Sequence, residues 1–188
     1  METHEKMKIK ETDLKDLLIV EPEIYEDERG YFYESFNFKK WSNYFNGNPP
    51  VFVQDNESLS HKNVLRGLHF QLPPHAQGKL VRVVQGAVLD VAVDLRKKSP
   101  TFKKSFKLLL SERNKRQLYI PEGFAHGFVA LEDNTRFIYK CTDYYNREAE
   151  DAIVWNDPDL AIDWEVKEPV LSEKDKISQK FTNFVNIF

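Results

Sequence analysis

Apolar and polar residues alternate in short runs along most of the chain, and turn residues separate these runs. The clearest run is Ala87–Leu95, where alternate positions define two faces of one strand: Leu89, Val91, Val93 and Leu95 against Asp90, Ala92 and Asp94. Side chains of a β-strand point to its two faces in turn, so this period of two predicts a strand. Gln85-Gly86 predicts the turn before it.

Similar runs predict a largely β structure. The predicted strands are Leu17–Glu21, Gly30–Phe36, Val51–Asn56, Val64–Gln71, Lys79–Gln85, Ala87–Leu95, Ser105–Leu110, Gln117–Ile120, Gly123–Leu131 and Arg136–Thr142. Short helices are expected at Asn37–Phe45 and near Ser172, and the chain becomes polar after Tyr145. Many short strands separated by turns favour an antiparallel sandwich or barrel. The chain shows no internal repeat or linker, so one all-β domain is expected over residues 1–188.

Composition and charge limit the kinds of binding partner that can be expected. The formal net charge is -3 without a basic tract, which argues against a nucleic-acid partner. No apolar run approaches the roughly 20 residues that span a bilayer, so no membrane partner is expected. The N-terminus lacks the apolar core of a signal peptide, and Cys141 has no second cysteine to pair with, so a cytoplasmic location is expected. A Walker loop and a dinucleotide-binding Gly fingerprint are both missing from the sequence.

The first candidate for chemistry is the segment Arg66–Gln71, which contains His69. An imidazole has a pKa near neutrality and can act as a general base. A lone histidine in a strand is more often a core residue, but Arg66 and Gln71 beside it favour a polar site. Strict alternation places Arg66 and His69 on opposite faces. A β-bulge at Gly67 would bring them to the same side.

The second candidate is Pro121–Phe128, where the pattern Pro-x-Gly-x-x-His ends at His126. This pattern resembles the second conserved motif of cupins, whose histidine commonly binds a metal. The first cupin motif would supply a His-x-His pair and a glutamate, whereas this chain has only His69 with Gln71 two residues on. A transition metal needs several such ligands, so no metal is expected. Alternatively, His126 is a turn residue that bonds the backbone.

Two further features are open to a structural or a functional interpretation. Lys79 begins a predicted strand, and Tyr139 shares a strand face with Phe137 and Cys141. A phenol near a cation can serve as an acid, but a solvated lysine and a core tyrosine explain the same pattern. The segment after Leu171 reads as a helix start capped by Ser172. Asp175 in that segment is also suited to orient a histidine.

Together these segments resemble the dTDP-4-dehydrorhamnose 3,5-epimerase family, from Glu21-Pro22 to Lys174-Asp175. The matching segments are Asp27–Phe32 with Glu34, Gln54–Ser58, Val64–Gln71, Gln77–Arg82, Asp90–Arg96, Ile120–Phe128, Tyr144-Tyr145, Trp155–Pro158 and Ser172–Asp175. The resemblance implies a cupin-like antiparallel β jelly roll with a few short peripheral helices. It also implies a homodimer that shares its N-terminal strands, and a C-terminal extension, 146–188, that contributes Asp175.

The resemblance also implies roles for particular residues. His69 is expected to be the general base oriented by Asp175, Tyr139 the acid on the other face of the sugar, and Lys79 the residue that stabilises an enolate. The implied substrate is dTDP-4-dehydro-6-deoxy-D-glucose, the product is dTDP-4-dehydro-L-rhamnose, and no metal or organic cofactor is needed. Tyr145 is expected to stack on the thymine. The implied substrate-binding residues are Arg29, Phe32, Glu34, Gln54, Asp55, Asn56, Arg66, His126, Tyr145, Glu150 and Lys174.

Three other functions stay open at this stage. A sibling enzyme that epimerises only C3 of a dTDP-4-keto-deoxysugar would share the catalytic residues. A metal-dependent cupin such as a dioxygenase would need the missing ligands. A non-catalytic sugar-binding cupin would be expected to have lost His69 or Tyr139, and both are present. The chain departs from the family pattern at Lys103-Lys104, where relatives usually have glycine. This departure puts the conformation of that loop in doubt.

Overall fold

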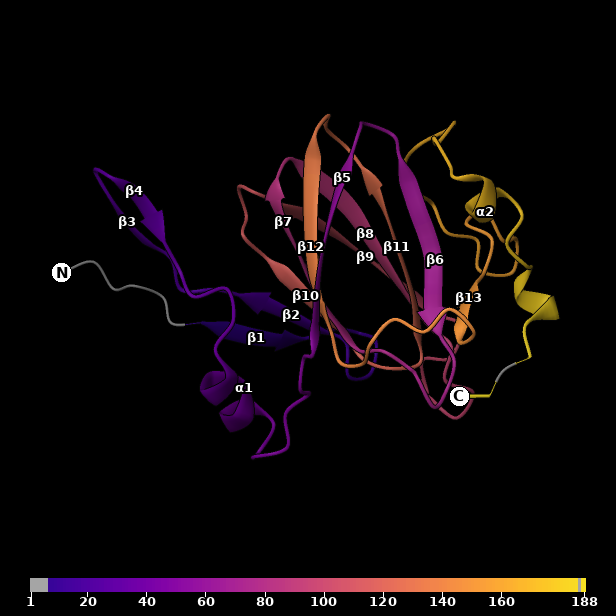
Figure 1. Cartoon of the computed structure of the whole chain (residues 1–188), viewed down its shortest axis with the longest axis horizontal. Coiled ribbons are helices and arrows are strands. Elements are labelled where there is room, and N and C mark those ends of the chain that lie inside the picture. The colour runs from indigo at the N-terminus through magenta and orange to yellow at the C-terminus, as the bar shows by residue number, and fades with distance from the viewer. Residues whose placement is uncertain (1–6, 186) are drawn as a thin grey trace.

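Two antiparallel sheets pack against each other in this computed structural model, which describes residues 7–185 and 187–188 (Figure 1). Residues 1–6, part of the segment expected to lack a signal peptide, lie outside the described residues. The six-stranded sheet has the order β1 (Lys8–Glu11), β2 (Leu18–Glu21), β10 (Gln117–Ile120), β7 (Lys79–Gln85), β12 (Thr135–Cys141), β5 (Gln54–Ser60). The five-stranded sheet has the order β13 (Glu150–Ala152), β6 (Leu65–Gln71), β11 (Phe124–Ala130), β8 (Ala87–Asp94), β9 (Ser105–Ser111). The predicted all-β, cupin-like jelly roll is confirmed.

The space between the sheets is filled by apolar side chains from both. Val81 and Val83 of β7 and Phe137 of β12 meet Val88 of β8 and Phe128 of β11 in one buried cluster. The rings of Phe128 and Phe137 stack with centroids 4.2 Å apart. This packing fixes the distance between the sheets, so side chains that reach inward from facing strands can share one pocket.

Strand β8 is buried on both faces because the C-terminal chain covers the outer face of its sheet. Leu89, Val91 and Val93 pack against a cluster contributed by the segment after β13: Leu160, Trp164, Phe181 and Phe184. The predicted division of β8 into two faces is therefore confirmed, since Val88 and Ala92 enter the other cluster. The C-terminal sequence is polar on average, so these few apolar residues do not form a recognisable pattern in it. The covering segment also brings the last helix, α2 (Glu173–Lys176), beside β6.

Both expected helices are present, and none of the helices in the described part is long and apolar enough to cross a membrane. Helix α1 (Phe38–Tyr44) begins after Asn37, whose side chain accepts a hydrogen bond from the Lys40 N–H. Its Trp41 is almost fully buried and stacks on Phe45 with centroids 5.5 Å apart. Helix α2 begins after Ser172, as expected, and a 3-10 turn η1 (Phe181–Asn183) follows it.

The strand predictions differ from the structure mainly near the N-terminus. The run Gly30–Phe36 forms a strand only over β4 (Gly30–Phe32), which pairs with β3 (Tyr25–Asp27) in an exposed hairpin. Figure 1 shows this hairpin projecting away from the two sheets. Strand β5 starts later than predicted and runs on to Ser60, because its polar second half pairs with β12. β1, β3 and β13 are mostly polar and were not predicted.

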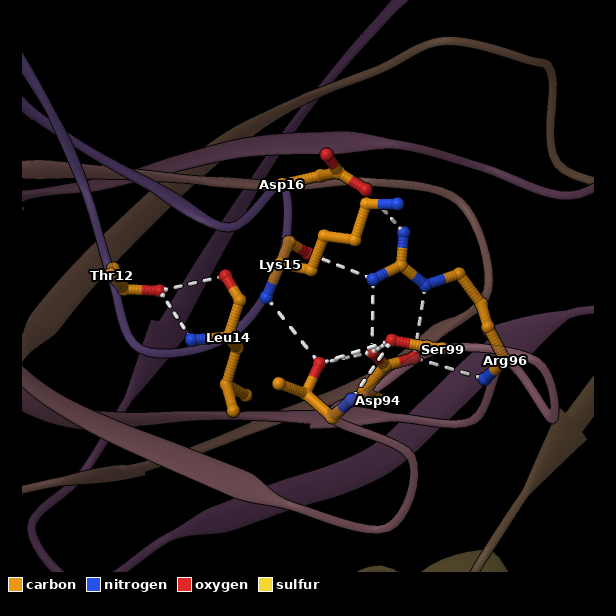
Figure 2. A network of polar contacts seen from close by, with 8 residues as sticks. Thr12, Leu14, Lys15, Asp16, Asp94, Arg96 and Ser99 are labelled. Carbon is orange, nitrogen blue, oxygen red and sulfur yellow. Dashed lines mark hydrogen bonds and ion pairs between the residues drawn. The ribbon is translucent and has the colours of Figure 1, made fainter.

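A buried carboxylate fastens the loop before β2 to the end of β8 (Figure 2). Asp94 accepts hydrogen bonds from Arg96, Ser99 and Thr101. Burial alone would raise the pKa of Asp94, but these hydrogen bonds hold it below its ordinary value. Arg96 also donates to the Asp16 carboxylate at 2.7 Å. The network therefore ties residues 12–16 to the second sheet.

The loop at the departure from the family pattern closes within the same region. Lys103 adopts a φ of 67°, in the left-handed region that glycine occupies at lower cost. Its N–H donates to the Asp94 carbonyl at 2.8 Å, and its ammonium lies 4.7 Å from the Phe181 ring centroid. Lys103 therefore occupies a backbone conformation that favours glycine, and its side chain still packs on Phe181.

Candidate active site

A pocket of about 160 Å³ opens between the two sheets. It is lined by three of the predicted catalytic residues, His69, Lys79 and Tyr139. Four of the predicted binding residues also line it: Gln54, Asn56, Tyr145 and Glu150. His69 comes from β6 of the five-stranded sheet, whereas Lys79 and Tyr139 come from β7 and β12 of the six-stranded sheet. The candidate base and the candidate acid therefore stand on opposite walls.

The imidazole of His69 is held by a buried carboxylate. Its Nε2 lies 2.5 Å from an oxygen of Asp175, which is 3% exposed. The other oxygen of Asp175 accepts from the Ser172 hydroxyl at 2.8 Å. Burial would raise the pKa of Asp175, but hydrogen bonds from His69 and Ser172 outweigh it and lower the pKa. Asp175 thus stays ionised and can accept a hydrogen bond from Nε2, and in the neutral tautomer that donates this bond Nδ1 is the nitrogen with the lone pair.

The predicted bulge beside His69 is present. His69 pairs with His126 of β11 and Arg66 pairs with Phe128, so β6 spans one residue more than β11 over this stretch. Gly67 within it has a φ of +132°, and a Cβ there would lie 2.5 Å from the Gly127 Cα. Only glycine fits, and the extra residue brings Arg66 and His69 to the same neighbouring cavity.

The opposite wall pairs a cation with a phenol. The Lys79 ammonium lies 6.0 Å from the centroid of the Tyr139 ring, and Lys79 faces Cys141 directly across the β7–β12 ladder. Burial lowers the pKa of Lys79 and raises the pKa of Tyr139. Tyr139 therefore keeps its proton at neutral pH and can donate it, as a general acid must.

The outer part of the pocket is a connected polar rim. The Tyr145 hydroxyl donates to Glu150 at 2.8 Å, and Glu150 pairs with Lys174 at 2.5 Å. Burial would raise the pKa of Glu150, but hydrogen bonds from Lys174 and Tyr145 lower it. The Tyr145 N–H donates to the Gln54 side chain at 2.9 Å, and Gln54 donates to Asn56 at 3.0 Å. The exposed Tyr145 ring is therefore anchored at both its backbone and its hydroxyl.

Three predicted binding residues lie elsewhere around this pocket. Arg66 lines the neighbouring cavity and donates to the Ser60 hydroxyl at 3.1 Å. His126 is buried behind the lining, 2.9 Å from Asp90, so it is not a turn residue that bonds the backbone. Its predicted binding role stays a prediction. Asp55 lines a different groove, where it pairs with Lys140 at 2.9 Å. Within the described residues, no group of three or more His, Cys, Asp or Glu is placed to hold a metal.

Three further predicted binding residues, Arg29, Phe32 and Glu34, lie in or just after the β3–β4 hairpin. Arg29 pairs with Asp27 at 2.5 Å in the same hairpin, and Glu34 pairs with Lys40 at 2.5 Å. Phe32 is 67% exposed. None of the predicted binding residues Arg29, Phe32 and Glu34 is brought to the pocket by its own chain.

The sequence predictions assigned no role to four residues that line the pocket: Phe70, Gln71, Gln77 and Cys141. Cys141 is almost fully buried, accepts a hydrogen bond from Asn56 at 3.6 Å and has its pKa raised by burial. The period of two that groups Cys141 with Tyr139 could have indicated it. Gln71 follows His69 at the same spacing.

The match to known proteins spans nearly the whole chain. The profile of the family described as dTDP-4-dehydrorhamnose 3,5-epimerase matches residues 11–183. The chain belongs to this family. An enzyme of that name from Shigella flexneri is 53% identical over 177 residues, which cover 94% of this chain and 97% of the relative. Family membership makes the chain an isomerase, a sugar-nucleotide epimerase of dTDP-rhamnose biosynthesis.

Solved structures of dTDP-4-dehydrorhamnose 3,5-epimerases share the fold throughout. The enzyme from Elizabethkingia anophelis NUHP1 is 51% identical with a TM-score of 0.90, covering 96% of this chain and 98% of that one. A dTDP-6-deoxy-D-glucose-3,5-epimerase from Legionella pneumophila Philadelphia 1, in complex with dTDP-4-keto-L-rhamnose, is also 51% identical with a TM-score of 0.90, and the match covers 95% of both chains. A 3'-monoepimerase from Streptomyces bikiniensis is only 32% identical, with a TM-score of 0.84 over 90% of this chain and 85% of that one. The chain is thus more similar to the 3,5-epimerases than to this C3-specific enzyme.

Proposed function

We propose that the chain inverts C3 and C5 of dTDP-4-dehydro-6-deoxy-D-glucose with His69 as the base and Tyr139 as the acid, giving dTDP-4-dehydro-L-rhamnose. The observation that carries this proposal is the placement of the two groups on opposite walls of one pocket. Inversion at a carbon requires that the proton leaves one face and a new proton arrives at the other. A single base that served one face would return the proton it had removed.

The 4-ketone makes this proton transfer feasible. The C–H bonds at C3 and C5 are acidified because each carbanion delocalises onto the C4 oxygen as an enolate. His69 Nδ1 accepts the proton while Asp175 stabilises the imidazolium that forms. Lys79 stabilises the enolate oxygen, a contribution of about 2.7–4 kcal/mol by analogy with oxyanion-hole donors. Tyr139 then gives its proton to the opposite face of the carbon.

The polar rim is suited to the nucleotide. The exposed ring of Tyr145 offers a flat surface on which a thymine can stack, with Gln54 and Asn56 beside it as amide partners for the nucleotide. Lys174 and Arg66 supply positive charge near the pocket for the diphosphate. The pocket then has two ends, one for the thymine and one for the sugar, with His69 at the sugar end.

The remaining predicted residues fit a homodimer in which each hairpin completes the partner's pocket. Arg29 and Phe32 are exposed on a hairpin that projects away from its own sheets (Figure 1). An exposed aromatic on such a projection favours burial against a second copy. A cytoplasmic location suits the unpaired Cys141 and a sugar-nucleotide substrate.

The experiment that tests the reaction is incubation with dTDP-4-dehydro-6-deoxy-D-glucose in deuterated water. We expect deuterium to be incorporated at both C3 and C5, as measured by proton NMR of the sugar. Deuterium at C3 alone would assign the chain to the C3-specific enzymes. No exchange at either carbon would contradict the proposal.

A further inference from the structure

The segment that carries Tyr145 has no regular secondary structure, yet it has to present a ring at a fixed place. It links β12 to β13 and spans residues 142–149. Tyr145 itself is 56% exposed, so packing does not hold its ring. Its own N–H donates to Gln54 and its hydroxyl to Glu150, and its position depends further on the hydrogen bonds of the backbone on either side of it.

One buried side chain holds the backbone on both sides of Tyr145. Gln71 Nε2 donates to the Tyr144 carbonyl at 3.2 Å, and Gln71 Oε1 accepts from the Asn146 N–H at 2.8 Å. The second amide hydrogen goes to the His75 carbonyl at 2.7 Å. Two carbonyls and one N–H around the amide leave only one orientation that satisfies them all. Gln71 is 5% exposed, so its amide makes these hydrogen bonds largely shielded from solvent.

The position of Gln71 ties this clamp to the catalytic strand. Gln71 follows His69 by two residues on β6, so both side chains leave the strand on the same face and both line the pocket. A second glutamine, Gln77 in the loop before β7, adds to this clamp because it donates to the Asp143 carbonyl at 2.7 Å. His69 is fixed separately by Asp175. Loss of the Gln71 clamp should therefore leave the base in place.

We propose that Gln71 is a positioning residue that holds Tyr145 ready to stack on the nucleotide base of the substrate. This inference rests on the proposed function, because it takes Tyr145 as the stacking surface. Gln71 acts on affinity through Tyr145 and makes no contribution of its own to proton transfer. The position that supplies a second imidazole in metal-binding cupins is thus used here to order a recognition loop.

The test is Gln71→Met, which keeps the length of the side chain and removes all three hydrogen bonds. Base stacking of roughly 1–3 kcal/mol corresponds to about a 5- to 160-fold range in affinity, and we expect dTDP binding to weaken within this range. KM should rise by a similar factor, while kcat at saturating substrate stays within about threefold of wild type. This pattern indicates an interaction that binds substrate and transition state equally. Gln71→Glu is the second variant, because it keeps the acceptor for Asn146 but loses the donor to Tyr144.

The matched control is Thr101→Val in the Asp94 network, because Thr101 also makes a buried hydrogen bond but does not line the pocket. It should lower stability and leave dTDP affinity unchanged. The double variant Gln71→Met with Tyr145→Ala should bind dTDP no more weakly than Tyr145→Ala alone, since both changes act on one contact.

The outcomes separate the two proposals. If Tyr145→Ala does not change dTDP affinity, the stacking assignment in the proposed function is wrong. If Tyr145→Ala weakens binding but neither Gln71 variant does, only the role of Gln71 is overturned. Additive losses in the double variant, or a fall in kcat as large as the rise in KM, would also overturn it.

Discussion

His69 Nε2 lies 2.5 Å from Asp175, although the two residues are 106 positions apart in the chain. Asp175 reaches β6 because the C-terminal segment packs on the outer face of the five-stranded sheet and contains the capped helix α2. The orientation of the base therefore depends on the packing of residues that do not line the pocket. Changes in this segment should alter catalysis through Asp175.

Asp175→Asn should reduce turnover sharply and leave the fold intact. The amide keeps the shape of the side chain but loses the charge that stabilises the imidazolium, and it can favour the wrong tautomer of His69. We expect kcat to fall by about 10²- to 10⁴-fold, the range associated with loss of general-base catalysis. Circular dichroism and dTDP inhibition should match the wild type. Turnover within a few-fold of wild type would remove Asp175 from the mechanism.

Lys79 should set the alkaline limit of activity. Burial lowers its pKa, so the positive charge that stabilises the enolate is lost as pH rises through a value below that of a free lysine. The pKa of Tyr139 is raised, so the phenol still carries its proton there. The pH profile of kcat should therefore fall on the alkaline side when Lys79 deprotonates.

The variant that checks this assignment is Lys79→Arg, because a guanidinium stays charged throughout the working pH range. We expect a lower rate with no alkaline fall. Cys141→Ala should keep the fall, which excludes the thiol as its source, and Lys107→Arg on the surface should leave the profile unchanged. The same alkaline fall in Lys79→Arg would show that another group controls it.

Activity should survive treatment with a chelator and dialysis. His126, the histidine of the cupin-like motif, is bonded to Asp90, and the partner positions of a metal site are occupied by His69 and Gln71, each bonded elsewhere. Turnover before and after treatment is the measurement, with metal content determined in parallel. Loss of turnover that returns on adding one metal would favour a metal-dependent reaction instead.

Much of the pocket could be predicted because it is built on strands. Gln54 and Asn56 stand two positions apart in the predicted strand Val51–Asn56, which places them on one face, and both line the pocket. Gly67 marked the place where a bulge would bring Arg66 and His69 together, and the structure has a bulge there. A period of two and a glycine in a strand are local signals, so a single sequence contains them.

The parts that could not be predicted depend on contacts between distant segments. The Asp175 motif reads locally as a helix start, and its contact with His69 arises only once the C-terminal chain has packed on β8. β13 has no apolar pattern, because it is defined by pairing with β6. The burial of His126 against Asp90 likewise follows from the pairing of β11 with β8.

The hairpin should act on the pocket of a second copy. We expect a dimer by sedimentation, and weak activity for the double variant Arg29→Ala/Phe32→Ala. Co-expression of this variant with His69→Ala should restore activity above both parents, because one pocket of the mixed dimer then has an intact base and an intact hairpin. Purification through a different tag on each chain isolates the mixed dimer. No gain over the parents would indicate that the hairpin serves its own chain or no pocket.

Tyr139→Phe should separate proton removal from inversion. The change deletes only the hydroxyl, so the ring still packs on Phe137 and beside Lys79. His69 can still remove a proton, and Lys79 can still stabilise the enolate. What is lost is the donor on the opposite face, so the enolate takes back a proton from His69 or is quenched slowly by water.

In deuterated water, Tyr139→Phe should therefore still place deuterium on the substrate carbons while net epimerisation falls by about 10²- to 10⁴-fold. His69→Ala is the control that should lose exchange and epimerisation together, since no enolate forms. A tyrosine with only a packing role would give small, equal losses in both rates that follow the loss of stability. Equal rates of exchange and inversion in Tyr139→Phe would mean that another group delivers the proton, so that Tyr139 is not the general acid.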